Sequence, residues 1–132
     1  MEKKRILAVD DDASIGEFYE TSLKMMGFDV RVAANARAAK ESILLHRPDL
    51  ILMDIMMPDQ DGISLTRELR NDRKTSDIPI IMVSGLADAG TLQDALLFGA
   101  VGYLVKPVDQ DALKAKIDST LAAIEHRNKK NS

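Results

Sequence analysis

The stretch that decides the fold reads Leu50-Ile51-Leu52-Met53-Asp54-Ile55-Met56-Met57-Pro58-Asp59-Gln60-Asp61-Gly62. Its four leading apolar residues form a short unbroken run, which is typical of a parallel strand buried on both faces. Pro58 and Gly62 then turn the chain. Asp54 therefore lies at the carboxyl end of the strand, the edge at which open parallel sheets bind ligands. A carboxylate buried there is costly unless a cation meets it, so Asp54 is the first candidate for chemistry.

Two other apolar runs lead into polar side chains in the same way. Ile6–Val9 is followed by Asp10 and Asp11, and Ile80–Val83 is followed by Ser84. Both runs are short and unbroken, which predicts interior strands of a parallel sheet. Each of these strands is therefore followed by a side chain that can take part in binding or catalysis.

The remaining two strands have the features of sheet edges. Residues 30–33 alternate between apolar and polar side chains, which is typical of a half-exposed strand. Residues 101–105 include Tyr103 and lead into Lys106 and Pro107. The sequence thus predicts three interior strands and two edge strands.

Segments with apolar residues at helical spacing follow each of the five strands. Side chains suited to cap a helix precede four of them: Asp11 or Asp12, Asn35, Asp88 and Asp109. Strand and helix alternate five times, which predicts an α/β fold. We expect a doubly wound five-stranded parallel sheet with strand order 2-1-3-4-5 and five helices on both faces.

This strand order gathers polar side chains from separate stretches on one rim. The first and third strands are neighbours where the winding reverses, so Asp10 and Asp11 lie beside Asp54. Ser84 and Lys106 follow the fourth and fifth strands on the same rim. Three close carboxylates repel one another, and one lysine does not balance them. A divalent cation does, and Mg²⁺ suits carboxylates together with phosphate oxygens.

The rim is therefore suited to hold a phosphoryl group. The metal and Lys106 balance its negative oxygens, and the Ser84 hydroxyl donates a hydrogen bond. Asp54 is the candidate nucleophile, since carboxylates form aspartyl phosphates. Taken singly, an acid after a strand is more often a helix cap, and a Lys-Pro pair is more often a turn. The functional interpretation depends on all these groups sharing one rim.

The composition restricts the possible classes of function. The chain has 132 residues, 45% of them hydrophobic, which suffices for one domain with a core. A net charge of -3 gives no case for direct binding of nucleic acid. The chain has no cysteine, which excludes thiolate chemistry. The apolar run near the amino terminus is too short for a signal peptide or a membrane span, so we expect a cytoplasmic protein without membrane contact.

Together these motifs resemble the receiver domain of two-component response regulators, of the chemotaxis-regulator type. The similarity runs from about Arg5 to Ile124, and the ordered motifs that carry it are Asp10-Asp11, Asp54–Gly62, Ser84-Gly85 and Tyr103–Pro107. It implies a flavodoxin-like fold and a phosphoprotein of a phosphorelay, in which Asp54 takes the phosphoryl group of a phosphohistidine. The donor would be a sensor histidine kinase or a histidine phosphotransfer protein. Such a domain is not an enzyme for external metabolites and catalyses only its own phosphorylation and dephosphorylation.

The resemblance also implies a metal site and a phosphoryl site. Mg²⁺ would be held by four groups: the carboxylates of Asp11 and Asp54, the backbone carbonyl of Met56, and Asp10 through water. Lys106 and Ser84 would contact the phosphoryl oxygens. The peptide bond before the proline that matches Pro107 is often cis in this family.

Phosphorylation should switch a distant surface. A phosphoryl group on Asp54 is expected to draw the Ser84 hydroxyl toward it and vacate the space behind. Tyr103 then reports the change on the surface around the fourth helix, fifth strand and fifth helix, which controls an output partner or domain. Met56 and Leu86 lie two residues beyond the acceptor and the hydroxyl residue, and we expect them to restrict the attacking water and lengthen the phosphoryl lifetime.

Two other functions fit the sequence less well. A magnesium-dependent phosphatase with an Asp nucleophile normally has a second acid two residues later, where this chain has Met56. A flavin-binding module of the same fold needs a phosphate loop rich in Ser, Thr and Gly after the first strand, where this chain has acids. We expect the receiver domain to span residues 1–125, and residues 126–132 to be a polar tail or the start of a linker. The cognate kinase, the output and the oligomeric state are not encoded in any recognisable motif.

Overall fold

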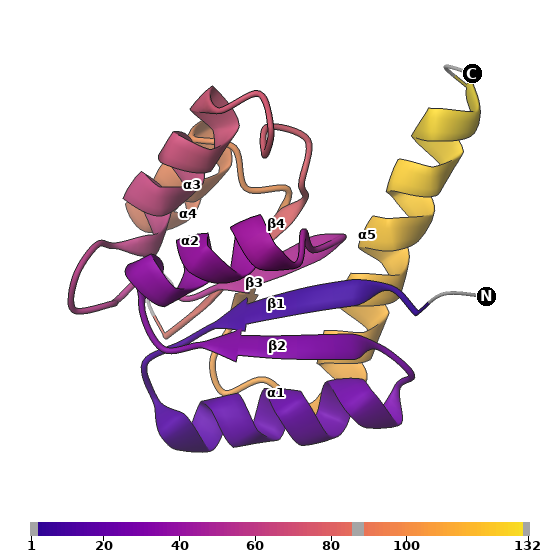
Figure 1. Ribbon diagram of the computed structural model, residues 1–132, viewed down its shortest axis with the longest axis horizontal. Helices are drawn as coiled ribbons and strands as arrows, with labels where there is room; N and C mark the ends of the chain where they lie inside the picture. Colours follow the sequence, from indigo (N-terminus) through magenta and orange to yellow (C-terminus); the bar gives the residue numbers. More distant parts are fainter. Residues whose placement is uncertain (1–2, 86–88, 131–132) are drawn as a thin grey trace.

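A central sheet lies between two layers of helices (Figure 1). The computed structural model describes residues 3–85 and 89–130. Its five strands are β1 Arg5–Val9, β2 Asp29–Ala33, β3 Leu50–Met53, β4 Ile80–Ser84 and β5 Gly102–Val105. All neighbouring strands pair in parallel, in the order β2-β1-β3-β4-β5. The predicted fold class and strand order are confirmed.

The register of the sheet aligns the ends of the interior strands. Val9 of β1 pairs with Met53 of β3, and Met53 pairs with Met82 of β4. Because β1 and β3 end at the same level, the next residues, Asp10 and Asp54, start side by side. The close approach of these two residues is thus a consequence of strand pairing.

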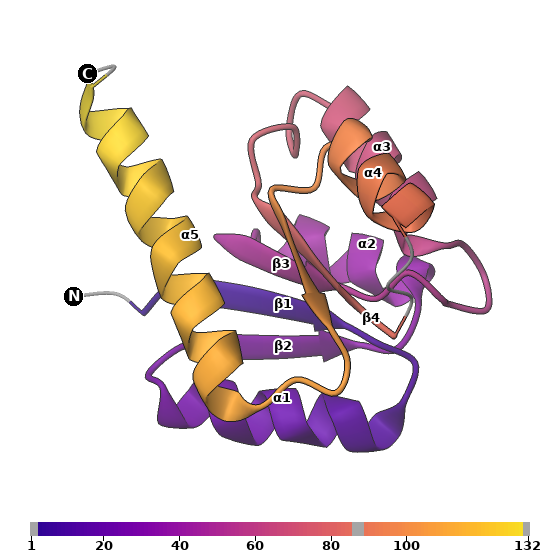
Figure 2. The same cartoon turned by 180° about the vertical axis from the view of Figure 1, so that it is seen from behind.

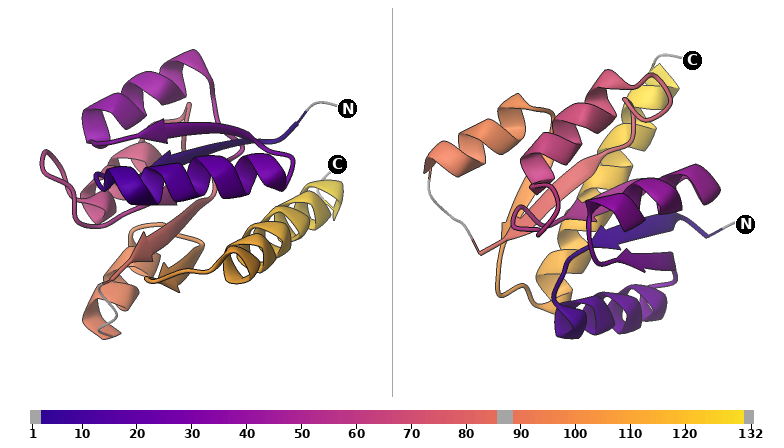
Figure 3. Two further views of the ribbon diagram at one scale, coloured as in Figure 1. Left: turned by 90° about the horizontal axis from the view of Figure 1, so that it is seen from below. Right: turned by 60° about the vertical axis from the view of Figure 1, so that its left-hand side comes forward.

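The helices cover both faces of the sheet, as Figures 2 and 3 show from other sides. Their bounds are α1 Ala13–Met25, α2 Ala36–Leu45, α3 Gly62–Asn71, α4 Ala89–Leu97 and α5 Gln110–Lys130. One core cluster joins the sheet to α1 and α5, through residues such as Leu23 and Ile117. The other joins it to α2, α3 and α4, through residues such as Ala39, Leu65 and Ala95. β3 contributes to both clusters because it is apolar on both faces.

Helix caps account for several of the element boundaries. Asp12, rather than Asp11, caps α1, because its carboxylate accepts a hydrogen bond from the Ser14 N–H at 2.9 Å. Asn35 caps α2 in the same way, as predicted. The Asp109 carboxylate accepts from the Ala112 N–H at 2.7 Å before α5. The predicted cap Asp88 lies outside the described residues.

The carboxyl-terminal part of the chain differs in detail from expectation. β5 begins at Gly102, one residue later than predicted, and Val101 is exposed. α5 continues as one helix to Lys130, so residues 126–130 are helical. Within the described part of the chain, no helix is both long and apolar enough to cross a bilayer.

Candidate functional site

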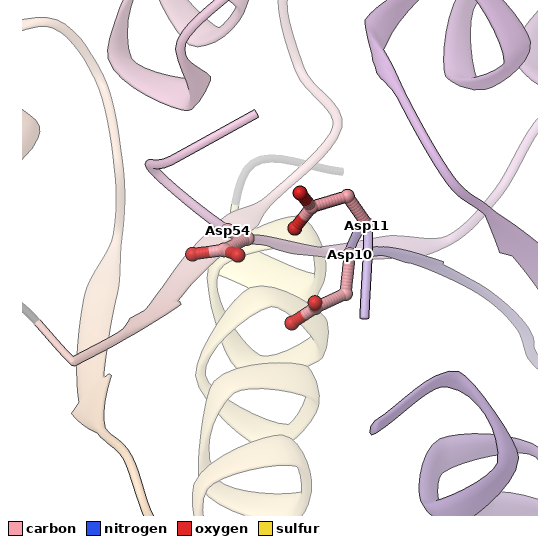
Figure 4. Close-up of side chains that lie close together, drawn as sticks. All are labelled: Asp10, Asp11 and Asp54. Atoms are coloured by element: carbon pink, nitrogen blue, oxygen red, sulfur yellow. The ribbon is translucent and has the colours of Figure 1, made fainter. Parts of the chain in front are cut away.

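Three carboxylates converge at the carboxyl edge of the sheet (Figure 4). Asp10 follows β1, where its N–H donates to the Ala33 carbonyl oxygen at 3.0 Å. Asp54 follows β3, where its N–H donates to the Val9 carbonyl oxygen at 3.0 Å. One carboxylate oxygen from each of Asp10, Asp11 and Asp54 lies within 4.8 Å of the other two. The strands thus bring together acids that are more than forty residues apart in sequence.

Lys106 is the cation that meets this cluster. Its Nζ lies 2.7 Å from Asp10 Oδ2 and 3.2 Å from Asp54 Oδ2. Asp10 and Asp54 are only 3% and 5% exposed, whereas Asp11 is exposed. Two of the three carboxylates are therefore largely withdrawn from water, and one ammonium group is shared between them.

The electrostatics of the site favour additional positive charge. Burial and the neighbouring charge of Asp10 raise the pKa of Asp54, and this outweighs the lowering by Lys106. Burial alone would lower the pKa of Lys106, but its hydrogen bonds and charge interactions with Asp10 and Asp54 raise it overall. The lysine therefore stays protonated, and its single positive charge only partly balances the negative charge of the neighbouring carboxylates.

Ser84 and Lys106 lie on the same rim because β4 and β5 pair in parallel. Ser84 is the last residue of β4 and pairs with Val105, and the Lys106 N–H donates to the Ser84 carbonyl oxygen at 2.9 Å. Ser84 is 1% exposed. The Lys106–Pro107 peptide bond is cis, as the family resemblance implied. The predicted rim thus contains Asp10, Asp11, Asp54, Ser84 and Lys106.

Met56 and Tyr103 occupy different surroundings from the acids. The backbone N–H of Met56 lowers the pKa of the Asp54 carboxyl, while the Met56 side chain is 64% exposed. Tyr103 lies on β5, in register with Met82, and its half-buried ring packs against the core cluster on the α2, α3 and α4 side of the sheet. Leu86, paired with Met56 in the sequence argument, lies outside the described residues.

The loop from Ile55 to Asp61 carries two structural features that the sequence did not reveal. A Cβ on Gly62 would lie 2.0 Å from the Asp54 carbonyl oxygen, so the first turn of α3 packs directly on the candidate acceptor. The Asp59 carboxylate accepts hydrogen bonds from the N–H groups of Ala36 and Arg37, both at 3.0 Å. These partners lie 23 and 22 residues away in sequence. The hydrogen bonds could therefore be predicted only if the position of α2 in space were known.

The donor set fits a hard divalent cation. Carboxylate oxygens from three residues can approach one point, and such oxygens are the ligands that Mg²⁺ prefers. Burial and the neighbouring charge of Asp10 raise the pKa of Asp54, so a bound cation would stabilise its ionised form. With Lys106 and Ser84 beside it, the rim offers both a cation site and partners for an anionic group.

The comparison with known families agrees with this geometry. The response regulator receiver domain family matches residues 6–118. The chain belongs to that family. The match covers the sheet except for the first residue of β1, together with the first part of α5, so it includes every residue of the rim.

Relatives of the receiver domain include longer regulators. It is 43% identical over 124 residues to a probable transcriptional regulator, ycf27, of Cyanophora paradoxa, covering 94% of this chain and 51% of the relative. It is 36% identical over 120 residues to the DNA-binding dual master transcriptional regulator RpaA of Synechocystis, covering 89% of this chain and 48% of the relative. The chain thus spans about half the length of these curated relatives.

Solved structures give the same fold. A CheY-like response regulator receiver domain protein from Methanospirillum hungatei superposes with a TM-score of 0.89 at 33% identity, covering 96% of this chain and 99% of that one. The chemotaxis protein CheY4 of Vibrio cholerae gives a TM-score of 0.85 at 29% identity, covering 89% and 98%. The flavodoxin-like receiver fold is therefore confirmed.

Proposed function

We propose that this receiver domain accepts a phosphoryl group on Asp54 from the phosphohistidine of a sensor histidine kinase or a histidine phosphotransfer protein. The observation that carries the proposal is the Lys106 ammonium group shared by Asp10 and Asp54 at 2.7 and 3.2 Å, beside a third carboxylate. A buried cluster of this kind is poorly neutralised alone and is suited to bind a cation and an anion together.

The transfer would be a direct displacement at phosphorus. A carboxylate oxygen of Asp54 forms a bond to phosphorus while the bond from phosphorus to the histidine nitrogen breaks, and the imidazole keeps the electron pair and takes a proton from solvent. Lys106, held by Asp10, balances the phosphoryl oxygens, and the Ser84 hydroxyl donates to one of them. Bound by Asp10, Asp11, Asp54 and the Met56 carbonyl, Mg²⁺ would supply neutralisation of the developing negative charge.

The consequence of phosphorylation would be a change of surface rather than turnover of a metabolite. We propose that Ser84 moves toward the phosphoryl group and that Tyr103 follows, which alters the surface around α4, β5 and α5. That surface would control an output partner or domain in the cytoplasm. The names of the two relatives, both transcriptional regulators, support an output in transcription.

The proposal is tested by incubating the protein with acetyl phosphate and Mg²⁺ and measuring the intact mass. We expect a gain of one phosphoryl group in the wild type, none in Asp54→Ala, and none in the wild type with a chelator. Equal phosphorylation of Asp54→Ala and the wild type would place the acceptor elsewhere.

A further inference from the structure

We infer that Asp59 is a positioning residue that fixes the loop after Asp54 to the amino terminus of α2, and thereby holds the Met56 carbonyl in place for the metal. The inference rests on the proposed function for the role of that carbonyl. The fixation of the loop itself stands on the geometry of the metal-free protein.

The loop from Ile55 to Asp61 is anchored at its ends by the buried Ile55 and by Asp61, which caps α3. At its far end, the Gly62 N–H donates to the Ile55 carbonyl oxygen at 2.8 Å, which closes the loop on itself. Pro58 has no N–H to donate, and the side chains of Met56 and Pro58 are exposed. The Gln60 side chain makes one long contact, 3.4 Å, to Glu68 of α3. The half-buried Met57 side chain packs against the core cluster on the α2, α3 and α4 side of the sheet, and Asp59 adds the hydrogen bonds that join the middle of the loop to another element.

The connection is made by two charge-assisted hydrogen bonds. Asp59 Oδ1 accepts from the Ala36 N–H and Oδ2 from the Arg37 N–H, each at 3.0 Å. A helix leaves its first N–H groups without partners inside the helix, and its amino terminus attracts negative charge. These hydrogen bonds also lower the pKa of Asp59, so the carboxylate stays ionised at neutral pH. Both oxygens are engaged, which fixes the orientation of the carboxylate as well as its position.

The local cap of α2 is a separate residue. Asn35 accepts a hydrogen bond from the Ala38 N–H at 2.8 Å and thus stabilises the same helix terminus. It belongs to the β2–α2 connection and not to the loop after Asp54. Loss of either side chain removes hydrogen bonds from the start of α2, but only loss of Asp59 releases the loop. Asn35 therefore provides a matched control.

The site explains why the position of this loop matters. Met56 follows the acceptor by only two residues, and its backbone N–H lowers the pKa of the Asp54 carboxyl. Only two residues, Met57 and Pro58, lie between Met56 and Asp59, and Pro58 restricts the backbone there. A shift of the loop at Asp59 is therefore transmitted to Met56. Mutation of groups that orient metal ligands typically weakens metal affinity by about 10–100-fold.

The experiment compares Asp59→Ala, the milder Asp59→Asn and the control Asn35→Ala in the full chain. ¹⁵N relaxation of the metal-free proteins gives backbone order parameters for Met56, Met57 and Gln60. A Mg²⁺ titration followed by amide resonances gives the dissociation constant for the metal alone. We expect Asp59→Ala to lower these order parameters and to raise the Mg²⁺ dissociation constant about tenfold. Asp59→Asn should give order parameters and a Mg²⁺ dissociation constant between those of Asp59→Ala and the wild type. Asn35→Ala should match the wild type in both measurements.

Three results would overturn the inference. If the loop of Asp59→Ala is as ordered as that of the wild type, Asp59 does not fix it. If Asn35→Ala weakens Mg²⁺ binding equally, the effect arises from α2 stability alone. If Asp59→Ala loosens the loop but leaves Mg²⁺ affinity unchanged, Asp59 has no positioning role. A wild type that binds no Mg²⁺ would instead refute the proposed function, and the metal-free order parameters would still decide whether Asp59 fixes the loop.

Discussion

Gly62 lies so close to Asp54 that a Cβ at residue 62 would be 2.0 Å from the Asp54 carbonyl oxygen. The same Cβ would lie 2.9 Å from the side chain of Met53. The turn after the candidate acceptor therefore packs backbone against backbone, and the first turn of α3 leaves no space for a side chain at residue 62.

We predict that Gly62→Ala lowers the free energy of unfolding by about 1–3 kcal/mol or more, because neither the Asp54 backbone nor the buried Met53 can move away cheaply. Urea denaturation measures this change. Gly85→Ala is the matched control, since a Cβ there meets nothing within 4 Å. An unfolding free energy for Gly62→Ala equal to that of Gly85→Ala would show that the close approach is not a constraint.

The raised pKa of Asp54 predicts a specific pH dependence for the metal-free protein. Between its ordinary pKa of about 3.9 and its higher folded value, Asp54 binds more protons in the folded state than in the unfolded state. Its contribution to stability is therefore fully present below the ordinary pKa and is lost as pH rises through the folded pKa. Asp54→Asn lacks this contribution, so the wild type should lose stability relative to the variant over that range.

The measurement is a series of urea denaturations without Mg²⁺ across this pH range. Asp59→Asn is an informative comparison because the backbone hydrogen bonds from Ala36 and Arg37 lower the pKa of Asp59. Its contribution has the opposite sign: it is present above the ordinary pKa and lost as pH falls. A pH-independent difference between the wild type and Asp54→Asn would contradict the charge interactions assigned to the site.

The rim was predictable from sequence because it follows from strand order and register. Short apolar runs before Asp10, Asp54 and Ser84 identified the interior strands, and the parallel arrangement then placed their ends together. The shared contact of Lys106 with Asp10 and Asp54 is a consequence of this topology, since all three follow strands at one edge.

Long-range backbone contacts could not be predicted in this way. The bond from Asp59 to α2 depends on where that helix starts in space, and an acid in a polar turn is usually solvated. The requirement for Gly62 depends on the path of α3, whereas the sequence indicated only a turn. The cap Asp12 was one of two adjacent candidates, because Asp11 is equally able to cap a helix and only the backbone angles distinguish them.

The proposed switch predicts a change in the accessibility of Tyr103. Phosphorylation should let the half-buried ring move inward, which reduces quenching of tyrosine fluorescence by acrylamide. The chain has two tyrosines and no tryptophan, and Tyr19 is buried, so Tyr103 dominates the quenched signal. Ser84→Ala should abolish the change, because the hydroxyl that couples the two positions is lost, and Tyr103→Phe should leave only the insensitive signal of Tyr19. An unchanged response in Ser84→Ala would rule out this coupling.

Met56 should influence how long the phosphoryl group survives. Its side chain, two residues after the acceptor, is exposed and has no group that orients water. We predict that Met56→Asn dephosphorylates faster, because a shorter amide side chain admits and hydrogen-bonds the attacking water. The decay of the phosphorylated mass after removal of acetyl phosphate measures this rate. A decay equal to or slower than that of the wild type would end the hypothesis.

The most direct test of the central claim locates the phosphoryl group itself. Borohydride reduces an aspartyl phosphate to homoserine with release of phosphate, which marks the acceptor permanently, and peptide mass spectrometry then identifies the marked residue. After treatment with acetyl phosphate and Mg²⁺, we predict homoserine at position 54 and unmodified aspartate at positions 10 and 11. Homoserine at position 10 or 11, or at no position in a phosphorylated chain, would contradict the account.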